Sequence, residues 1–144
     1  MESNYNQQQA LANTISGDLA RQIAEAASQK HGVDPELLLA MMYTESTLNP
    51  RATSRTGAKG LMQLMPGTAK EVGVRNPYDP RENVMGGAKY IRKLSDKYGG
   101  DISKALQAYH GGPGNVARKT IPRRSRQYAR KILNRKDILE MGED

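Results

Sequence analysis

Signals that begin and end helices recur along this chain, and they constrain its fold more than any other feature. Asp34-Pro35 and Asp79-Pro80 each place a capping side chain before a proline, which a helix tolerates in its first turn. Further helices are predicted to begin after Ser16, Asp101 and Pro122, and the predicted stops are Gly32, Asn49-Pro50, Gly99-Gly100 and the GGPG run. No segment alternates apolar and polar residues as a strand does. The sequence therefore predicts a mainly α fold.

The remaining segments set the domain organisation. Residues 51–60 have a turn-like composition, and GLMQLMPGTAKEVG after them predicts two short helical pieces broken around Pro66. A chain of 144 residues is one ordinary domain that can bury a core. We expect a flexible polar tail over residues 1–15, a single folded domain over residues 16–134, and a C-terminal tail over residues 135–144.

The composition excludes several classes of site. There is no cysteine, which excludes disulfides and thiolate metal sites, and His31 and His110 supply the two imidazoles of the sequence. We therefore predict no metal and no cofactor. The N-terminus has no basic region followed by an apolar run, so no secretory signal is visible, and no segment approaches membrane-spanning length.

Positive charge is concentrated near the C-terminus. The net charge is +7, and no acid occurs between Asp101 and Asp137. The basic residues in that interval include Arg118, Lys119, Arg123, Arg124, Arg126, Arg130, Lys131, Arg135 and Lys136. Such a surface attracts polyanions, so nucleic acid and an anionic wall or membrane surface are candidate partners. The alternative is an ordinary solvated helix face, because Lys and Arg usually lie outside.

Glu45 is the residue that most suggests chemistry. It stands near the end of a short apolar helix, where a carboxylate is unfavourable because the last carbonyls carry partial negative charge. Leu38, Met41 and Met42 precede it at helical spacing, so its side chain shares their apolar stripe. Burial would raise its pKa, as a general acid near neutral pH requires. The alternatives are a carboxylate in water at the edge of the stripe, or one that accepts a structural hydrogen bond.

The stretch after Glu45 lacks a second carboxylate. No acid occurs from Ser46 to Lys70, the polar region expected to line a cleft beside Glu45. A glycosidase with two carboxylates needs them about 5 Å apart for retention of configuration and somewhat farther apart for inversion. More distant acids that folding could bring closer are Glu71, Asp79, Glu82 and Asp101. If the chain cleaves glycans, the local sequence favours a mechanism with one carboxylate.

Three ordered segments of the chain resemble a known family. They are ESTLNPRATSRTGAKGLMQLMPGTA, NPYDPRENVMGGAKYIRKL and ALQAYHGGPGNV, and they resemble the soluble-lytic-transglycosylase (SLT) domain. The resemblance runs from about Leu19 to Leu133. One piece such as GLMQ would be weak evidence, but the ordered set is specific. It implies a single lysozyme-like helical domain, of the SLT or goose-type lysozyme kind, that acts on peptidoglycan.

The resemblance also implies a chemistry for Glu45. The family places its single catalytic acid at the Glu of an E-S motif, which is Glu45-Ser46 here. Glu45 would then protonate the glycosidic oxygen between N-acetylmuramic acid (MurNAc) and N-acetylglucosamine (GlcNAc). As a base it would next take the proton from the MurNAc C6 hydroxyl, which attacks C1 and leaves a 1,6-anhydroMurNAc end. Intramolecular attack has a high effective molarity, so no second carboxylate is needed to activate water.

A substrate-binding set follows from the same resemblance. Ser46 matches a Ser near the substrate acetamide, although a hydroxyl at a helix end also bonds its own backbone. Gly60, Met62 and Gln63 belong to the GLMQ motif. Gly60 also suits a tight turn and Met62 suits the core, whereas Gln63 offers both a donor and an acceptor to a sugar amide. We therefore expect Gln63 to bind substrate.

Two tyrosines belong to the expected site. Tyr109 matches the Tyr of the family's A-Y-N-A-G motif, which lines the cleft near the acid, and its ring also fits the core stripe of its helix. We expect the ring to be packed and the hydroxyl to face the site. Tyr128 resembles the late Tyr of the P-x-E-T-x-x-Y pattern, which supports the catalytic Glu, and plain core packing is its alternative.

The chain departs from the family pattern at two places. His110 and Gly111 stand where the family usually has Asn and Ala. His110 can hydrogen-bond as Asn does, so it joins the substrate-binding set, and it adds a group that titrates near neutrality. A purely structural histidine is the alternative. Arg124 and Ser125 replace Glu and Thr before Tyr128, which removes an acid from the site region.

Other functions stay open at this point. A muramidase would share the substrate and the fold, but water would be the nucleophile and the released end would be reducing. A nucleic-acid-binding module could use the Arg-rich C-terminal helix with Tyr128, but charge without a recognised reading motif is weak evidence. A wall-binding protein that has lost activity is a third alternative, and the intact Glu45 argues against it.

The expected setting is the periplasm or cell wall. Because no leader is visible, a phage lysin or a virion component is favoured over a secreted, secretion-system transglycosylase. We expect a monomer whose partners are peptidoglycan glycan strands, with the basic C-terminal helix facing an anionic wall or membrane surface. No specific nucleic acid is expected.

Overall fold

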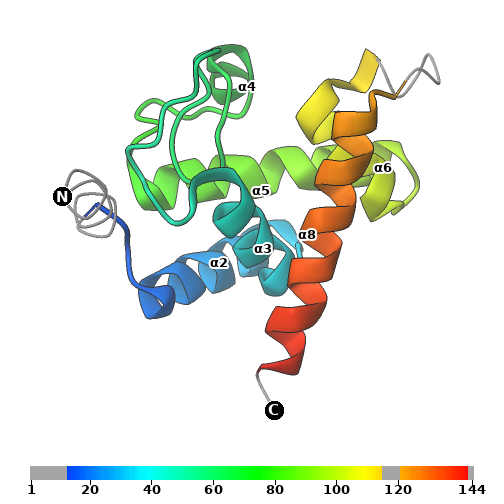
Figure 1. The fold of residues 1–144 in the computed structure, drawn as a ribbon. Coiled ribbons are helices and arrows are strands. Elements are labelled where there is room, and N and C mark those ends of the chain that lie inside the picture. The colour runs from blue at the N-terminus through cyan, green and yellow to red at the C-terminus, as the bar shows by residue number, and fades with distance from the viewer. Residues whose placement is uncertain (1–12, 115–120, 143–144) are drawn as a thin grey trace, which may run out of the picture.

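The fold is mainly α, as the helix signals predict. The computed structural model describes residues 13–114 and 121–142 (Figure 1). Its helices are α2 (Gly17–His31), α3 (Pro35–Ser46), α4 (Pro66–Glu71), α5 (Pro80–Lys97), α6 (Ile102–Gly111) and α8 (Arg123–Met141). In the described ranges the β structure is limited to isolated bridges that pair Lys59 with Thr53 and with Leu64.

The predicted capping residues begin four of these helices. The side chains of Ser16, Asp34, Asp79 and Asp101 accept hydrogen bonds from backbone N–H groups in the first turns of α2, α3, α5 and α6. Gly32 ends α2 in the left-handed conformation, with φ of 67°. These starts and this stop are confirmed.

Two predicted boundaries around α3 and α4 were wrong. α3 ends at Ser46, before the predicted stop at Asn49-Pro50, because Thr47 adopts a left-handed C-cap whose N–H donates to the Tyr43 carbonyl. A helical piece before Pro66 is absent, and residues 60–63 form a turn instead. Gly60 and Gln63 both have positive φ, at 83° and 51°, which a continuous helix cannot contain.

The ends of the chain also differ from the expected organisation. α8 continues to Met141, past residue 134 where the folded domain was expected to end, and Lys136 forms ion pairs with Asp34 and Glu140. At the other end the Ile15 N–H donates to the Leu48 carbonyl at 2.9 Å, so the last part of the expected tail is attached to the domain. Residues 1–12 of that tail, and Arg118 and Lys119 of the basic stretch, lie outside the described residues.

The helix α3 forms the centre of the core. Every residue from Leu37 to Met42 is buried, so the middle of this helix is enclosed on all sides. α2 and α8 pack on α3, and α5 packs on α2 and α6. Figure 1 shows α4 and the loops before it on one side of the molecule, and α6 with the first turns of α8 on the other. The C-terminal end of α3 therefore receives contacts from segments far apart in sequence.

Candidate active site

Glu45 lies in the last turn of α3 and is partly buried. Burial penalises the charged form of the carboxyl group and raises the pKa of Glu45 from 4.5 to about 7. This is the direction that the apolar stripe of Leu38, Met41 and Met42 predicted. A carboxyl group with such a pKa is populated in both protonation states near neutral pH, so it can both give and take a proton.

Tyr128 on α8 touches Glu45 directly. Its hydroxyl donates a hydrogen bond to Oε2 of Glu45 at 3.0 Å, and its side chain is almost entirely buried. The bond stabilises the carboxylate and lowers the pKa of Glu45, which opposes the larger effect of burial. Burial, and then the charge of Glu45, raises the pKa of Tyr128 well above its usual value, so the phenol stays protonated as a donor. The structure thus brings these two predicted residues together.

One carboxyl group dominates the chemistry of this site. Within residues 13–114 and 121–142, burial and the Tyr128 hydrogen bond account for the pKa shift of Glu45, and no second carboxylate contributes to it. The same part of the chain contains no group of three His, Asp or Glu side chains that could hold a metal ion. The arrangement therefore suits proton transfer by a single group.

Tyr109 lies close to Glu45 but uses its hydroxyl within the protein. The hydroxyl donates to the Met62 carbonyl at 2.7 Å, which joins α6 to the turn at residues 60–63. Burial raises the pKa of Tyr109 well above its usual value, and the charge of Glu45 adds to the effect. Its ring packs against Tyr90 with the centroids 5.4 Å apart. The hydroxyl hydrogen thus bonds the Met62 carbonyl, whereas the family motif predicted a hydroxyl that faces the site.

Gly60 and Met62, two residues of the expected substrate-binding set, are buried in the structure. The Met62 side chain has no exposed surface and packs near Gly87, so it cannot touch a glycan. Gly60 is also buried, and its N–H donates to the Ala52 carbonyl. Both residues shape the turn, and their side-chain types follow from packing and from backbone conformation.

The side-chain donors of Ser46 and Gln63 bond to backbone carbonyls of the protein. The Ser46 hydroxyl lies 3.0 Å from the Met42 carbonyl and 2.9 Å from the Leu61 carbonyl, so it connects α3 to the turn. The Gln63 side chain donates through Nε2 to the carbonyls of Ala52 and Gly60. The amide donors of Gln63 are therefore used within the protein, and Oε1 is its acceptor atom.

Asn83 holds the turn in place and was not predicted from the sequence. Asn83 on α5 is fully buried; its Oδ1 accepts from the Met62 N–H at 2.7 Å, and its Nδ2 donates to the carbonyls of Lys59 and Pro77. It lies four and eight residues before Gly87 and Ile91 on the buried face of α5. A polar side chain on an apolar helical face was the signal that could have found it, as it found Glu45.

His110 and Ser125, two of the departures from the family pattern, touch each other. Nδ1 of His110 lies 2.9 Å from the Ser125 hydroxyl oxygen, and Ser125 is 1% exposed. The imidazole also lies against the Tyr128 ring, with centroids 4.7 Å apart and an angle of 30° between the planes. Burial, and then the charge of Arg124, lowers the pKa of His110. His110 therefore contacts the partner of Glu45 and not Glu45 itself.

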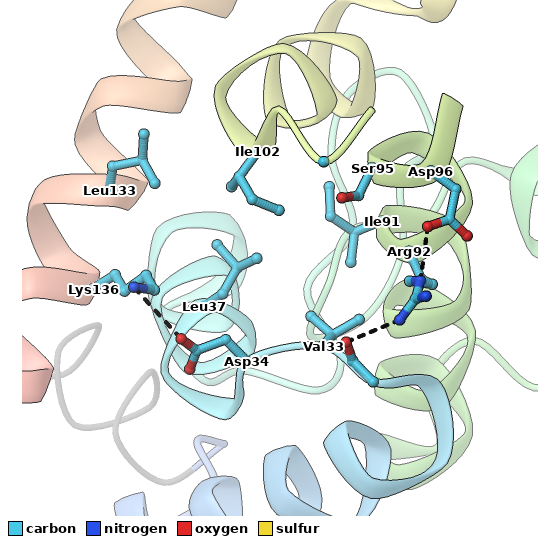
Figure 2. Close-up of a pocket in the computed structure, with 12 residues that line it drawn as sticks. Val33, Asp34, Leu37, Ile91, Arg92, Ser95, Asp96, Ile102, Leu133 and Lys136 are labelled. Carbon is cyan, nitrogen blue, oxygen red and sulfur yellow. Dashed lines mark hydrogen bonds and ion pairs between the residues drawn. The ribbon is translucent and has the colours of Figure 1, made fainter. Parts of the chain in front are cut away.

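A separate pocket lies at the opposite end of α3. Figure 2 shows Leu37, Ile91, Ile102 and Leu133 around it, and its volume is about 440 Å³. Its charged rim is internally paired, since Lys136 contacts Asp34 at 3.5 Å and Arg92 contacts Asp96 at 2.9 Å. The pocket contains none of the expected site residues.

None of the helices in the described part of the chain is long and apolar enough to cross a membrane.

Sequence comparisons place these features in a family. A family model described as "Transglycosylase SLT domain" matches residues 22–132. A "Transglycosylase" of Enterobacteria phage PRD1 is 55% identical over 87 residues, which cover 60% of this chain and 32% of that protein. A "Membrane-bound lytic murein transglycosylase F" of Pseudomonas fluorescens (strain Pf0-1) is 42% identical over 98 residues, covering 64% and 20%. The chain thus spans about a third or less of the length of these relatives.

Solved structures share the fold. An inactive mutant of the lytic transglycosylase Slt from Pseudomonas aeruginosa matches with a TM-score of 0.74 and 25% identity, over 82% of this chain and 23% of that one. The 70-kDa soluble lytic transglycosylase in complex with bulgecin A matches with a TM-score of 0.78 and 21% identity, over 85% and 24%. The lysozyme-like SLT fold that the three motifs predicted is therefore confirmed. Because the family model also covers most of the folded chain, this protein belongs to the transglycosylase SLT domain family.

Proposed function

We propose that this protein is a peptidoglycan lytic transglycosylase that cleaves the MurNAc-β-1,4-GlcNAc bond and forms 1,6-anhydroMurNAc ends. The observation that carries the proposal is the state of Glu45. Its pKa of about 7 leaves it partly protonated at neutral pH, and it stands at the motif position where the family places its acid. The names of the relatives support the same activity.

The reaction needs one group to act twice. Protonated Glu45 gives its proton to the glycosidic oxygen as the bond to C1 of MurNAc breaks. The resulting carboxylate then takes the proton of the C6 hydroxyl while that oxygen bonds to C1, so Glu45 ends the cycle protonated. The C6 oxygen and the C1 carbon that it attacks belong to the same MurNAc residue, so no water is consumed.

Neighbouring residues have distinct roles in this scheme. The Tyr128 hydroxyl donates to Oε2 of Glu45, so it stabilises the carboxylate that exists between the two proton transfers. Gln63 offers Oε1 to an N–H of a sugar acetamide, since its donors bond the carbonyls of Ala52 and Gly60. Ser46 and Tyr109 fix the turn that carries Gln63 relative to α3 and α6.

Digestion of purified peptidoglycan tests the proposal. Wild-type protein and Glu45→Gln are incubated with the sacculi, and the released muropeptides are identified by mass spectrometry. We expect anhydro ends from the wild type and none from Glu45→Gln, because an amide cannot transfer the proton. The matched control is Glu25→Gln, which changes an exposed glutamate of α2 and should leave the products unchanged.

Two results would refute this function. Reducing ends in place of anhydro ends would mean that water is the nucleophile, which is the muramidase alternative. Full activity of a folded Glu45→Gln protein would remove Glu45 from the chemistry.

The setting is part of the proposal. We expect the protein to act as a monomer on glycan strands in the wall, and the phage PRD1 relative supports a phage lysin or virion role over a secretion-system role. The exposed arginines of α8 would face an anionic wall or membrane surface. To test this setting, the wild-type protein or Glu45→Gln is added to host cells from outside or delivered into them, and lysis is recorded. We expect lysis with the wild type and none with Glu45→Gln.

A further inference from the structure

The contact between His110 and Ser125 ties two helices together beside the candidate active site. His110 lies in the last turn of α6 and Ser125 in the first turn of α8. The Nδ1 to Oγ distance is 2.9 Å, and the serine is almost completely buried. A buried hydroxyl with one side-chain partner is costly to leave unpaired, so this bond fixes the position of the imidazole.

The imidazole of His110 also packs against the Tyr128 ring. Tyr128 follows Ser125 by three residues, so the two side chains lie on the same face of α8. His110 bonds the first and packs its ring on the second, with a centroid distance of 4.7 Å that is typical of stacked aromatic pairs. One side chain of α6 thus contacts two successive inward residues of α8.

The position of the Tyr128 ring decides where its hydroxyl lies. A tyrosine side chain is rigid beyond its two rotatable bonds, so a ring held on one face by His110 has a fixed hydroxyl position. That hydroxyl donates to Oε2 of Glu45 at 3.0 Å. The path from Ser125 through His110 and Tyr128 to Glu45 is therefore continuous, and each of its steps is a direct contact.

We infer that His110 is a positioning residue, which holds the Tyr128 hydroxyl against Glu45 and is itself anchored by Ser125. The inference rests on the proposed role of Glu45 and goes beyond it by assigning a function to the His110–Ser125 pair. It also differs from the substrate-binding role that the motif suggested for His110, because the ring acts through Tyr128.

The charges around His110 agree with a packing role. Of the described ionisable side chains, Tyr109 is next to His110 in α6, the Tyr128 ring of α8 packs on it, and the charge of Arg124 of α8 acts on its pKa; Glu45 of α3 lies beyond Tyr128. Burial and the charge of Arg124 lower the pKa of His110, which favours the uncharged ring that packs on Tyr128.

Two substitutions of His110 distinguish the effect of its ring from the effect of its hydrogen bond to Ser125. His110→Phe keeps an aromatic ring and loses the bond to Ser125, whereas His110→Asn keeps a polar group and loses the ring. We expect His110→Asn to lower kcat on the order of tenfold and to change KM by about twofold or less, because the lost contact acts on Glu45 and not on substrate binding. His110→Phe and Ser125→Ala each keep the ring but lose its anchor, so kcat in both should fall between that of His110→Asn and that of the wild type.

A titration that does not depend on catalysis completes the test. The pKa of Glu45 is measured by NMR from the carbon-13 shift of its side-chain carboxyl group, with Glu45→Gln used for assignment. His110→Asn and Tyr128→Phe should each raise this pKa, and the double variant should show no further rise beyond Tyr128→Phe alone. His110→Phe and Ser125→Ala, which keep a ring without its anchor, should raise it less than His110→Asn does.

Distinct results would overturn the inference. An unchanged pKa of Glu45 in folded His110→Asn would show that the ring does not hold Tyr128. A higher KM with unchanged kcat would mean that His110 contacts substrate. If His110→Asn does not fold, the same two readouts on Ser125→Ala decide, and an unchanged pKa and kcat there overturn the anchoring role. Activity in Glu45→Gln would refute the proposed function separately, because the titration still tests the positioning.

Discussion

At Glu45, burial and one hydrogen bond act on the same pKa in opposite directions. Burial raises the pKa of the carboxyl group, the Tyr128 hydroxyl lowers it, and the net value is about 7. A site that used burial alone would keep the acid protonated but would leave its carboxylate without a partner. The tyrosine supplies that partner, so the group can act as an acid and then as a base.

The raised pKa of Glu45 has a cost in stability that Glu45→Gln should remove. Because the pKa is higher in the folded state than the usual 4.5, the folded protein binds the proton more tightly, and stability is lost as the pH rises from about 4.5 through about 7. One pKa unit corresponds to about 1.4 kcal/mol, so the cost above pH 7 is at most on the order of 3 kcal/mol.

Urea unfolding at acidic and alkaline pH measures this effect. Glutamine resembles the neutral acid, so Glu45→Gln should be similar to the wild type in its free energy of unfolding below pH 4.5 and more stable than the wild type at pH 8. Glu25→Gln, on an exposed surface of α2, should show no such difference. An equal effect of Glu45→Gln at both pH values would contradict the buried, neutral carboxyl group.

Tyr128→Phe should shift the pH profile as well as slow the reaction. It removes the interaction that lowers the pKa of Glu45, so that pKa should rise and the alkaline limb of kcat/KM should move to higher pH. Loss of one hydrogen bond to a charged group should reduce kcat on the order of tenfold. Tyr98→Phe is the matched control, since the Tyr98 hydroxyl is buried without a hydrogen-bond partner in the described residues. A Tyr128→Phe profile identical to that of the wild type would contradict the contact.

The surroundings of a single residue were predicted best where they depend on neighbours in the same helix. The burial of Glu45 follows from three apolar neighbours on the same helix. The donors of Gln63 could not be predicted, because one of them bonds a carbonyl eleven residues away and depends on how the turn closes. The contact of His110 with Ser125 spans two helices, and nothing in either helix alone indicates it.

At the scale of elements, the turn at residues 60–63 depends on a close approach between backbone segments. A Cβ added to Gly60 would lie 2.1 Å from the Pro77 carbonyl oxygen and 2.2 Å from Nδ2 of Asn83, and its φ is 83°. The glycine therefore serves two needs, a left-handed backbone and room for Asn83. Gln63, the proposed acceptor for a sugar amide, is carried by this turn.

Gly60→Ala should destabilise the protein more than Gly57→Ala, and the comparison separates the two needs. Gly57 also has a positive φ, at 96°, but no atom lies near its added Cβ, so Gly57→Ala should cost only the backbone strain of about 1–2 kcal/mol. Gly60→Ala adds a clash with backbone and should cost about 3 kcal/mol or more in the free energy of unfolding. Urea unfolding measures both. Equal costs would mean that the turn can move away from Asn83.

Helices were predicted where their caps are local, and the turn was missed where its partners are distant. Ser16, Asp34, Asp79 and Asp101 bond N–H groups two or three residues ahead, so the sequence contains the whole interaction. The residues before Pro66 have apolar spacing that suits a helix. They form a turn instead because Asn83, on another helix, bonds the Met62 N–H and fixes the chain.

At the scale of the whole molecule, the charges divide into paired and unpaired regions. Arg126, Arg130 and Lys131 are exposed on α8, and none of the ion pairs in the described residues includes them. Their field should strengthen binding to an anionic wall polymer over a range set by the ionic strength. They lie on the surface, whereas Tyr128 of the same helix is buried.

Replacing these three residues by glutamine should weaken wall binding and leave catalysis intact. Three exposed charges at roughly 0.5 kcal/mol each should change affinity on the order of tenfold at low salt, with the difference shrinking as salt rises. Sedimentation with insoluble peptidoglycan across a salt series measures this. Turnover of short soluble glycans should stay at the wild-type rate, because among the described residues no hydrogen bond or ion pair joins the three exposed side chains to Glu45 or Tyr128.

A charge-matched control distinguishes the placement of the charges from their sum. Replacing Lys30, Arg81 and Lys89 by glutamine also lowers the net charge from +7 by three, but these exposed residues lie on α2 and α5. If the face of α8 binds the wall, this second triple variant should retain the wild-type salt dependence. If both variants lose affinity equally, net charge alone attracts the protein, and the direction in which α8 faces the wall is not set by its arginines.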